Sequence, residues 1–215
     1  MSADPTRLRA RPGLGRSRGG LPPGWKLDVP AVADDARPLA LAVVFHGGGS
    51  TAEAGLALLP AHPGLIRLAP QSLGTTWDIV RGGFGHDVER IDDALETVFA
   101  LVAVDPRRVA LAGFSDGASY ALSLGVGNGD LVTRVVAFSP GFLAPGVQRG
   151  RPRIFATHGT EDRVLPIDRC SRRLVPALRG AGYDVTYEEF DGGHGVMPHH
   201  ARFASDWIVR AVPEL

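Results

Sequence analysis

Residues 113–117, Gly-Phe-Ser-Asp-Gly, have the types and spacing of a turn that presents a nucleophilic serine. A short apolar run precedes Ser115 and a helix-like segment follows it, and in that setting a G-x-S-x-G turn exposes the serine hydroxyl. The turn strains the serine backbone, and the helix behind it favours developing negative charge. A glycine-rich turn whose serine only caps a helix is the alternative, because the chain has 28 glycines. Ser115 is therefore a candidate nucleophile that needs partners.

His194 is the candidate base for that serine. A serine hydroxyl attacks only when an imidazole accepts its proton and a carboxylate fixes the tautomer of the imidazole. After a G-x-S-x-G turn, the acid and then the base follow along the chain. His194 lies in Asp-Gly-Gly-His-Gly, residues 191–195, between the last predicted strand and the last predicted helix; an exposed loop histidine is the alternative. The remaining histidines fail on order or position: they are His46, His62, His86, His158, His199 and His200.

Asp162 is the candidate acid. It lies in His-Gly-Thr-Glu-Asp-Arg-Val-Leu-Pro, residues 158–166, directly after a predicted strand. This stretch reads as a strand-end turn built around the aspartate. Glu161 is an alternative acid in the same turn, whereas Asp168 is predicted to cap the next helix.

A glycine loop at residues 46–50, His-Gly-Gly-Gly-Ser, follows a strongly apolar run. A tetrahedral intermediate carries its charge on oxygen, and fixed backbone N–H groups stabilise that charge without rearranging. We expect one donor from Gly48 and a second from Asp116, the residue after the serine. A plain glycine-rich turn is the alternative, and a phosphate cradle is disfavoured because no Gly-Lys-Ser/Thr follows. His46 is predicted to brace the loop.

The elements that must position these residues alternate between strands and helices. Short apolar runs bounded by Gly or Pro predict strands buried on both faces, at residues 39–45, 65–69, 109–112, 134–138, 153–157 and 184–190. Helical spacing is found at residues 87–104, 115–124, 167–180 and 199–212, and Pro106 is predicted to stop the first of these helices. This alternation predicts an α/β fold with a mostly parallel sheet and helices on both faces. In such sheets the site lies at the carboxyl ends of the strands.

The length of 215 residues suits a single domain, and 44% hydrophobic residues are enough for a sizeable core. We divide the chain into an Arg/Pro/Gly-rich arm or edge hairpin at residues 1–24 and a catalytic domain at residues 25–215. Lys+Arg and Asp+Glu both count 23, so nothing favours nucleic acid or an acidic membrane surface as a partner. The oligomeric state is left open.

The single cysteine, Cys170, rules out an intrachain disulfide and a multi-thiolate metal site. No stretch has the roughly 20 apolar residues of a membrane span or the apolar run of a signal peptide. We therefore expect a cytoplasmic protein that uses no cofactor and no metal. Asp87 and Asp92 are interpreted as a solvated helix face.

The four motifs together resemble the compact serine esterases of the phospholipase/carboxylesterase group in the α/β-hydrolase superfamily. They are also similar to the esterase D and polyhydroxyalkanoate-depolymerase-like branches. The resemblance spans residues 39–215 and implies a triad of Ser115, Asp162 and His194, with main-chain donors at Gly48 and Asp116. It also implies a single α/β-hydrolase domain without a large lid, whose first strands come from the region before Leu39.

Candidate pocket residues lie in loops at the predicted strand ends, where apolar walls would surround a small-molecule ester substrate. They are Trp77, Phe114, Phe142, Leu143, Leu165 and Met197. Trp77 could equally be a buried core anchor, and Phe142 and Leu143 could belong to the core.

The expected activity is hydrolysis of small or short-chain carboxylic esters through an acyl-enzyme, with a rate that rises as His194 loses its proton. Alternatives are thioester, lysophospholipid, polyester or amide cleavage by the same triad. A non-catalytic binding module with this fold is a further alternative.

Overall fold

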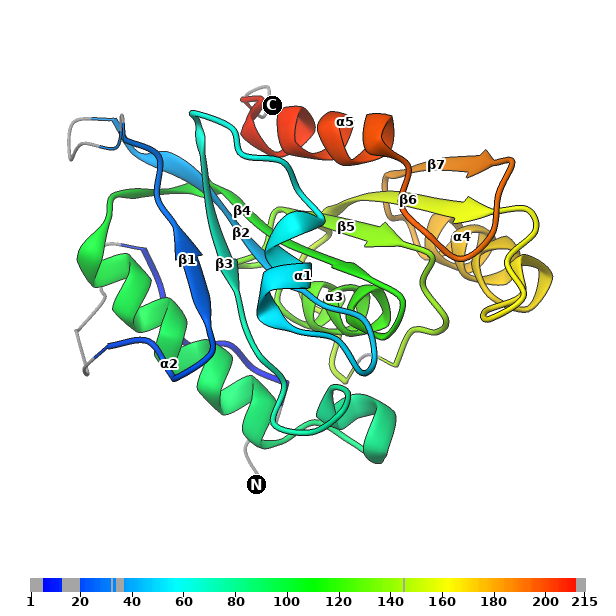
Figure 1. The fold of residues 1–215 in the computed structure, drawn as a ribbon, viewed down its shortest axis with the longest axis horizontal. Coiled ribbons are helices and arrows are strands. Elements are labelled where there is room, and N and C mark those ends of the chain that lie inside the picture. Colours follow the sequence, from blue (N-terminus) through cyan, green and yellow to red (C-terminus); the bar gives the residue numbers. More distant parts are fainter. Residues whose placement is uncertain (1–5, 13–19, 32, 34–36, 145, 212–215) are drawn as a thin grey trace.

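A single seven-stranded sheet forms the centre of the molecule in a computed structural model, which describes residues 6–12, 20–31, 33, 37–144 and 146–211 (Figure 1). The strand order is β1-β3-β2-β4-β5-β6-β7. All neighbouring strands are parallel except β1, which pairs antiparallel with β3 at the edge. The strands are β1 Lys26–Asp28, β2 Leu39–Phe45, β3 Leu65–Ala69, β4 Val104–Phe114, β5 Arg134–Phe138, β6 Arg153–Gly159 and β7 Val185–Phe190.

Helices cover both faces of this sheet. They are α1 Ala52–Ala57, α2 His86–Leu101, α3 Asp116–Gly127, α4 Ser171–Gly180 and α5 Pro198–Val209, with short 3₁₀ turns at η1 Asp78–Arg81 and η2 Ile167–Arg169. In Figure 1, α5 lies along one side of the sheet and α2 along the other. Within the described part of the chain, every helix is too short or too polar to cross a lipid bilayer.

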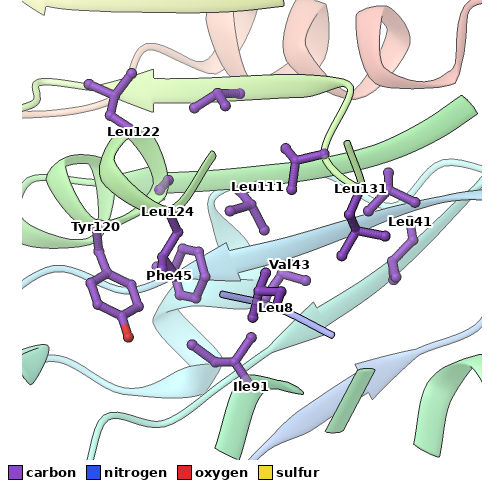
Figure 2. Packing of buried hydrophobic residues seen from close by; sticks show 14 of the residues in the cluster. Leu8, Leu41, Val43, Phe45, Ile91, Leu111, Tyr120, Leu122, Leu124 and Leu131 are labelled. Carbon is purple, nitrogen blue, oxygen red and sulfur yellow. The ribbon is translucent and has the colours of Figure 1, made fainter. Parts of the chain in front are cut away.

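Strand β2 shows why both faces are covered. Successive side chains of a strand point to opposite faces, and every residue of β2 is buried. Leu41 and Val43 belong to the core under α2 and α3, where Figure 2 shows Val43 close to Leu8 and Ile91. Ala42 and Val44 belong to the separate core under α5. A fully apolar run is therefore required here, as the sequence pattern indicated.

The predicted elements are present, with shifted bounds. The first predicted long helix ends at Leu101, because Val102 is extended and Val104 already pairs with Leu39 of β2. Strand β4 therefore begins well before residue 109, and Pro106 lies inside this strand instead of stopping the helix. Strand β1 lies in the region before Leu39, where the resemblance implied the first strands. Its bounds and helix α1 were not predicted, since elements of three and six residues have too little periodicity to recognise.

The arm or hairpin predicted at residues 1–24 lies partly outside the described residues. Residues 6–12 and 20–24 contain no strand. Leu8 is fully buried, and its N–H donates to Asn128 Oδ1 at 2.8 Å. Arg7 and Arg11 form ion pairs with Asp130. The described portion of this segment thus packs on the α/β body.

Candidate active site

The candidate nucleophile lies between β4 and α3. Ser115 has φ 56 and ψ −120, a left-handed conformation that is strained for any residue with a side chain. Its N–H donates to Phe138 O at the end of β5 at 3.0 Å. A Cβ on Gly117 would meet His46 O at 2.5 Å, so only glycine allows α3 to approach β2 this closely. The local sequence therefore accounts for both the strain and the close packing.

The candidate acid and base are in direct contact. His194 Nδ1 lies 2.6 Å from Asp162 Oδ2. The other carboxylate oxygen, Oδ1, accepts the N–H groups of Val164 and Leu165 at 2.9 and 2.8 Å. The Asp162 side chain is fully buried at the end of β6. The turn at residues 159–165 thus holds the carboxylate rigidly, while the alternative acid Glu161 is exposed.

These contacts set the ionisation of Asp162. Burial by itself would raise the pKa of its carboxyl group, but hydrogen bonds from His194, Leu165 and Val164 outweigh that effect. The pKa of Asp162 consequently lies below its ordinary value, and the carboxylate stays charged at neutral pH. A charged Asp162 favours the N–H of His194 on Nδ1, which leaves Nε2 available as a proton acceptor.

His158 is a further member of this cluster that the sequence argument set aside. It is fully buried, and its Nε2 lies 3.1 Å from Asp162 Oδ2 and 2.8 Å from Leu165 O. Both neighbours are acceptors, so Nε2 carries a hydrogen, and Nδ1 is left to accept the Ser171 hydroxyl at 2.6 Å. Burial lowers the pKa of His158 despite these partners. A neutral His158 therefore donates its Nε2 hydrogen to Leu165 O, and the same N–H lies 3.1 Å from the carboxylate that also holds His194.

The loop that carries His194 is attached to its neighbours at several points. Glu161 N–H donates to Gly192 O at 2.9 Å, and Ser139 Oγ donates to Gly195 O at 3.4 Å. The rings of Phe114 and His194 lie 4.6 Å apart between centroids. Ser139 is the second non-glycine residue with positive φ in the described chain. Its position after β5, next to the histidine loop, gave no signal in the sequence.

Ser115 and His194 line the same cleft, which has a volume of about 510 Å³. No hydrogen bond joins Ser115 Oγ to His194 Nε2 among the described residues, and such contacts often tighten only when a substrate binds. The cleft is lined by Gly47, Gly48, Ser50, Phe114, Ser115, Asp116, Val164, Leu165 and His194. Five residues were predicted for the chemistry, and four of them line this cleft: Gly48, Ser115, Asp116 and His194. The fifth, Asp162, contacts His194 from behind.

The glycine loop is braced from beneath by residues 72–78. His46 accepts the Ser72 N–H on Nε2 at 3.2 Å, so its Nδ1 carries the hydrogen that is donated to Gly47 O at 2.7 Å. Burial keeps the pKa of His46 below its ordinary value. Gly49 N–H donates to Thr75 O at 2.5 Å. The predicted bracing role of His46 agrees with these contacts.

Trp77 requires a correction. It is fully buried, its Nε1 donates to His46 O at 2.8 Å, and its ring stacks on Tyr120. A side chain enclosed in this way cannot line the cleft, so the core-anchor interpretation is right and the pocket interpretation is wrong. Trp77 supports the glycine loop by holding the His46 carbonyl.

The remaining pocket candidates divide into two groups. Phe114 and Leu165 line the cleft together with Val164. Phe142 and Leu143 are half-buried and pack against the large core, and Met197 immediately precedes α5. A contact between these last three residues and a substrate stays a prediction.

The interpretation of Asp87 as part of a solvated helix face is also wrong. Asp87 is buried and accepts the N–H groups of Leu73 and Asp78 at 3.0 and 3.1 Å. It fixes the segment that carries Trp77. Asp92 accepts the N–H groups of Arg9 and Ala10 and so anchors the N-terminal segment. Within the residues that the structure describes, no three acidic, histidine or cysteine side chains gather as a metal site would require.

Comparison with known proteins establishes the family. The family described as Phospholipase/Carboxylesterase matches residues 82–210, which is more than half of the chain and includes Ser115, Asp162 and His194. The chain belongs to the phospholipase/carboxylesterase family. The family supports hydrolase activity on esters, and the glycine loop at residues 46–50 lies outside the matched range. A search of curated proteins finds no match.

Solved structures confirm the predicted α/β-hydrolase fold for this family member. Esterase PE8 superposes with a TM-score of 0.67 at 23% identity, covering 85% of this chain and 96% of that chain. The Bacillus cereus carboxylesterase has a TM-score of 0.63 at 20% identity, covering 86% and 92%. A phospholipase/carboxylesterase from Dyadobacter fermentans DSM 18053 has a TM-score of 0.62 at 18% identity, covering 90% and 99%. At these identities the likeness establishes the fold alone.

Proposed function

We propose that this protein is a serine carboxylesterase that hydrolyses small or short-chain carboxylic esters through an acyl-enzyme. Ser115 is the nucleophile, His194 the base and Asp162 the acid. The observation that carries the proposal is the 2.6 Å contact between His194 Nδ1 and Asp162 Oδ2, behind a cleft that also contains the strained Ser115. We assign this activity to a catalytic domain at residues 25–215.

The chemistry follows from these positions. Ser115 Oγ forms a bond to the ester carbonyl carbon while its proton passes to His194 Nε2. The resulting oxyanion accepts hydrogen bonds from the main-chain N–H groups of Gly48 and Asp116. Collapse of this intermediate breaks the bond to the alcohol oxygen, which takes the proton from Nε2. Water then attacks the acyl-enzyme with the same proton transfers, and the carboxylic acid and free Ser115 result.

Asp162 acts by stabilising the imidazolium form of His194 in both transition states. Its carboxylate is buried and held by two main-chain N–H groups, so it cannot turn away from the imidazole. A fixed charge of this kind stabilises developing positive charge without reorganising.

The test combines labelling with turnover. We expect rapid hydrolysis of p-nitrophenyl acetate and butyrate, and a fluorophosphonate adduct that mass spectrometry maps to Ser115. Ser115→Ala should abolish both signals. Ser205→Ala is the matched control, since that hydroxyl lies on α5 and donates to Pro60 O away from the cleft. If the wild-type protein neither hydrolyses these esters nor reacts with the probe, the proposal is wrong.

The same triad could act on other acyl groups. A panel of thioester, lysophospholipid, polyester and amide substrates, measured beside the ester series, ranks these alternatives by kcat/KM. Tight binding of a small ester without turnover would favour the non-catalytic binding module.

A further inference from the structure

The side chain of Asp116 places a carboxylate in the cleft beside the candidate oxyanion donors. Asp116 directly follows Ser115, begins α3 and lines the cleft. Its Oδ2 accepts the Thr76 hydroxyl at 2.6 Å. A Cβ on Gly48 would meet this Oδ2 at 2.5 Å, so the carboxylate lies against the glycine loop. Contacts with Thr76 and Gly48 thus keep this carboxylate in the cleft that Ser115 also lines.

One of the two oxygens of this carboxylate is available to a substrate. Oδ1 of Asp116 makes no hydrogen bond to any residue that the structure describes, whereas both oxygens of Asp162 have protein donors. None of the residues that line the cleft is a lysine or an arginine. The cleft therefore has a negative charge that no cleft-lining cation offsets.

A negative charge in this position acts on the substrate. An anionic substrate is repelled by Asp116, and a cationic one is attracted, because charges a few ångströms apart interact strongly in a partly desolvated cleft. A positive charge on the substrate also offsets the repulsion between Asp116 and the developing oxyanion. Apart from the His194 imidazolium that forms during the reaction, no cleft-lining side chain supplies such a charge, since none is a lysine or an arginine.

We propose that Asp116 makes this site selective for esters that carry a cationic group, such as a quaternary or protonated amine, over neutral and anionic esters of the same shape. This inference rests on the proposed esterase function and specifies its substrate class. Asp116 contributes through two separate groups. Its main-chain N–H donates a hydrogen bond to the oxyanion, and its carboxylate attracts or repels the charged group of the substrate.

The test uses three p-nitrophenyl esters with the same leaving group. Their acyl chains end in a trimethylammonium group, in the isosteric tert-butyl group, or in a carboxylate. Each kcat/KM is divided by the rate of hydroxide hydrolysis of the same ester, which removes differences in intrinsic reactivity. We expect the cationic ester to exceed the neutral one by about tenfold and the anionic ester to fall below it by a similar factor, at low salt.

The decisive variant is Asp116→Asn, which keeps the main-chain N–H and an oxygen acceptor for Thr76 while removing the charge. We expect the ratio of cationic to anionic kcat/KM to fall by at least tenfold, and this ratio is the readout because any change in basal turnover affects both esters. Asp206→Asn, an exposed position on α5, makes the same change in net charge away from the cleft and should leave the ratio unchanged.

The outcomes separate the two proposals. Absence of turnover and of fluorophosphonate labelling overturns the esterase function. Turnover of all three esters with a ratio that Asp116→Asn does not alter overturns only the role of the Asp116 carboxylate. A ratio that falls equally in Asp206→Asn also overturns it, because net charge then accounts for the preference.

Discussion

The two sides of the cleft are built in different ways. The proposed acid–base side, residues 158–166 and 191–195, surrounds one buried carboxylate with the N–H groups of Val164 and Leu165 and with His194 Nδ1, and His158 Nε2 lies 3.1 Å away. The proposed oxyanion side, residues 46–50, 72–78 and 115–116, includes a cleft-lining carboxylate, Asp116, whose only protein donor in the described chain is Thr76.

The difference lies in where the supporting contacts come from. On the acid–base side, the two main-chain donors to Asp162 lie two and three residues away in the same turn. On the oxyanion side, His46 depends on Ser72 and Trp77, and Asp116 depends on Thr76, which lies 40 positions earlier. One side is therefore a locally closed turn with a fully satisfied charge. The other is held by a loop that is distant in sequence, and one oxygen of its carboxylate has no hydrogen-bond donor from the described protein.

Asp162→Asn should have the largest effect, because it removes the charge that stabilises the His194 imidazolium and favours the wrong tautomer. We expect kcat to fall by about 10⁴ in ester hydrolysis, as in comparable triads. Asp168→Asn, an exposed neighbour in η2 that pairs with Arg172, is the control and should stay near wild type. A loss below tenfold would show that Asp162 is not the acid.

Gly48→Ala tests the oxyanion side. The new Cβ would meet Asp116 Oδ2 at 2.5 Å and should displace the loop that presents the Gly48 N–H. We expect kcat to fall by about 10²–10³, the loss typical for one oxyanion donor, with the shape of the pH profile unchanged. Gly180→Ala, at the end of α4 with open space around it, is the control. Wild-type turnover in Gly48→Ala would show that this loop does not stabilise the oxyanion.

His158→Leu tests whether the buried histidine supports Asp162. Loss of one donor makes the Asp162 carboxylate more basic, so it holds the His194 imidazolium more tightly. The acidic limb of the kcat/KM profile should therefore move to higher pH, with a loss of about tenfold at neutral pH. The unfolding free energy should fall by about 1–3 kcal/mol, since the Leu165 carbonyl and Ser171 hydroxyl lose a buried partner.

His158→Gln keeps an N–H donor beside Asp162. Compared with His158→Leu, it should have a higher kcat/KM at neutral pH and an acidic limb closer to that of the wild type. A purely structural role for His158 would lower stability in both variants while leaving the pH profile where it is. That result would contradict the link between His158 and the acid.

Arg7→Ala should have the smallest effect and provides a reference outside the cleft. The Arg7 hydrogen bond lowers the pKa of Asp130 to about 2, against the opposing effect of its partial burial. Because the pKa is depressed in the folded state, this pair stabilises the protein fully above about pH 4, and the contribution is lost as the pH falls toward 2. The pair is partly exposed, so we expect less than about 1 kcal/mol.

Urea unfolding of wild type and Arg7→Ala should therefore differ at pH 6 and converge near pH 2, with kcat/KM unchanged. Arg173→Ala on α4 is the control for loss of an exposed arginine. A difference that persists undiminished at pH 2 would show that the pair is not the cause.

Several features of this protein were determined by the sequence alone. The alternation of apolar runs and helical segments predicted an α/β fold with a mostly parallel sheet, because strands buried on both faces must be continuously apolar. The resemblance of the four motifs to a known family then implied the α/β-hydrolase fold. The candidate residues Ser115, Asp162 and His194 could be named from order and spacing, since each lies in a short turn directly after a strand of one parallel sheet. Both predictions depend only on residues that are close together in the sequence.

Only the tertiary structure decided how these turns are supported. It buried Trp77 under His46, brought Asp87 to the loop it fixes, and placed His158 against Asp162. It also joined Thr76 to Asp116 and so left one carboxylate oxygen open in the cleft. Contacts between residues that are distant along the chain depend on which loops the sheet order makes neighbours. That order follows from packing of the whole core, and no single segment encodes it.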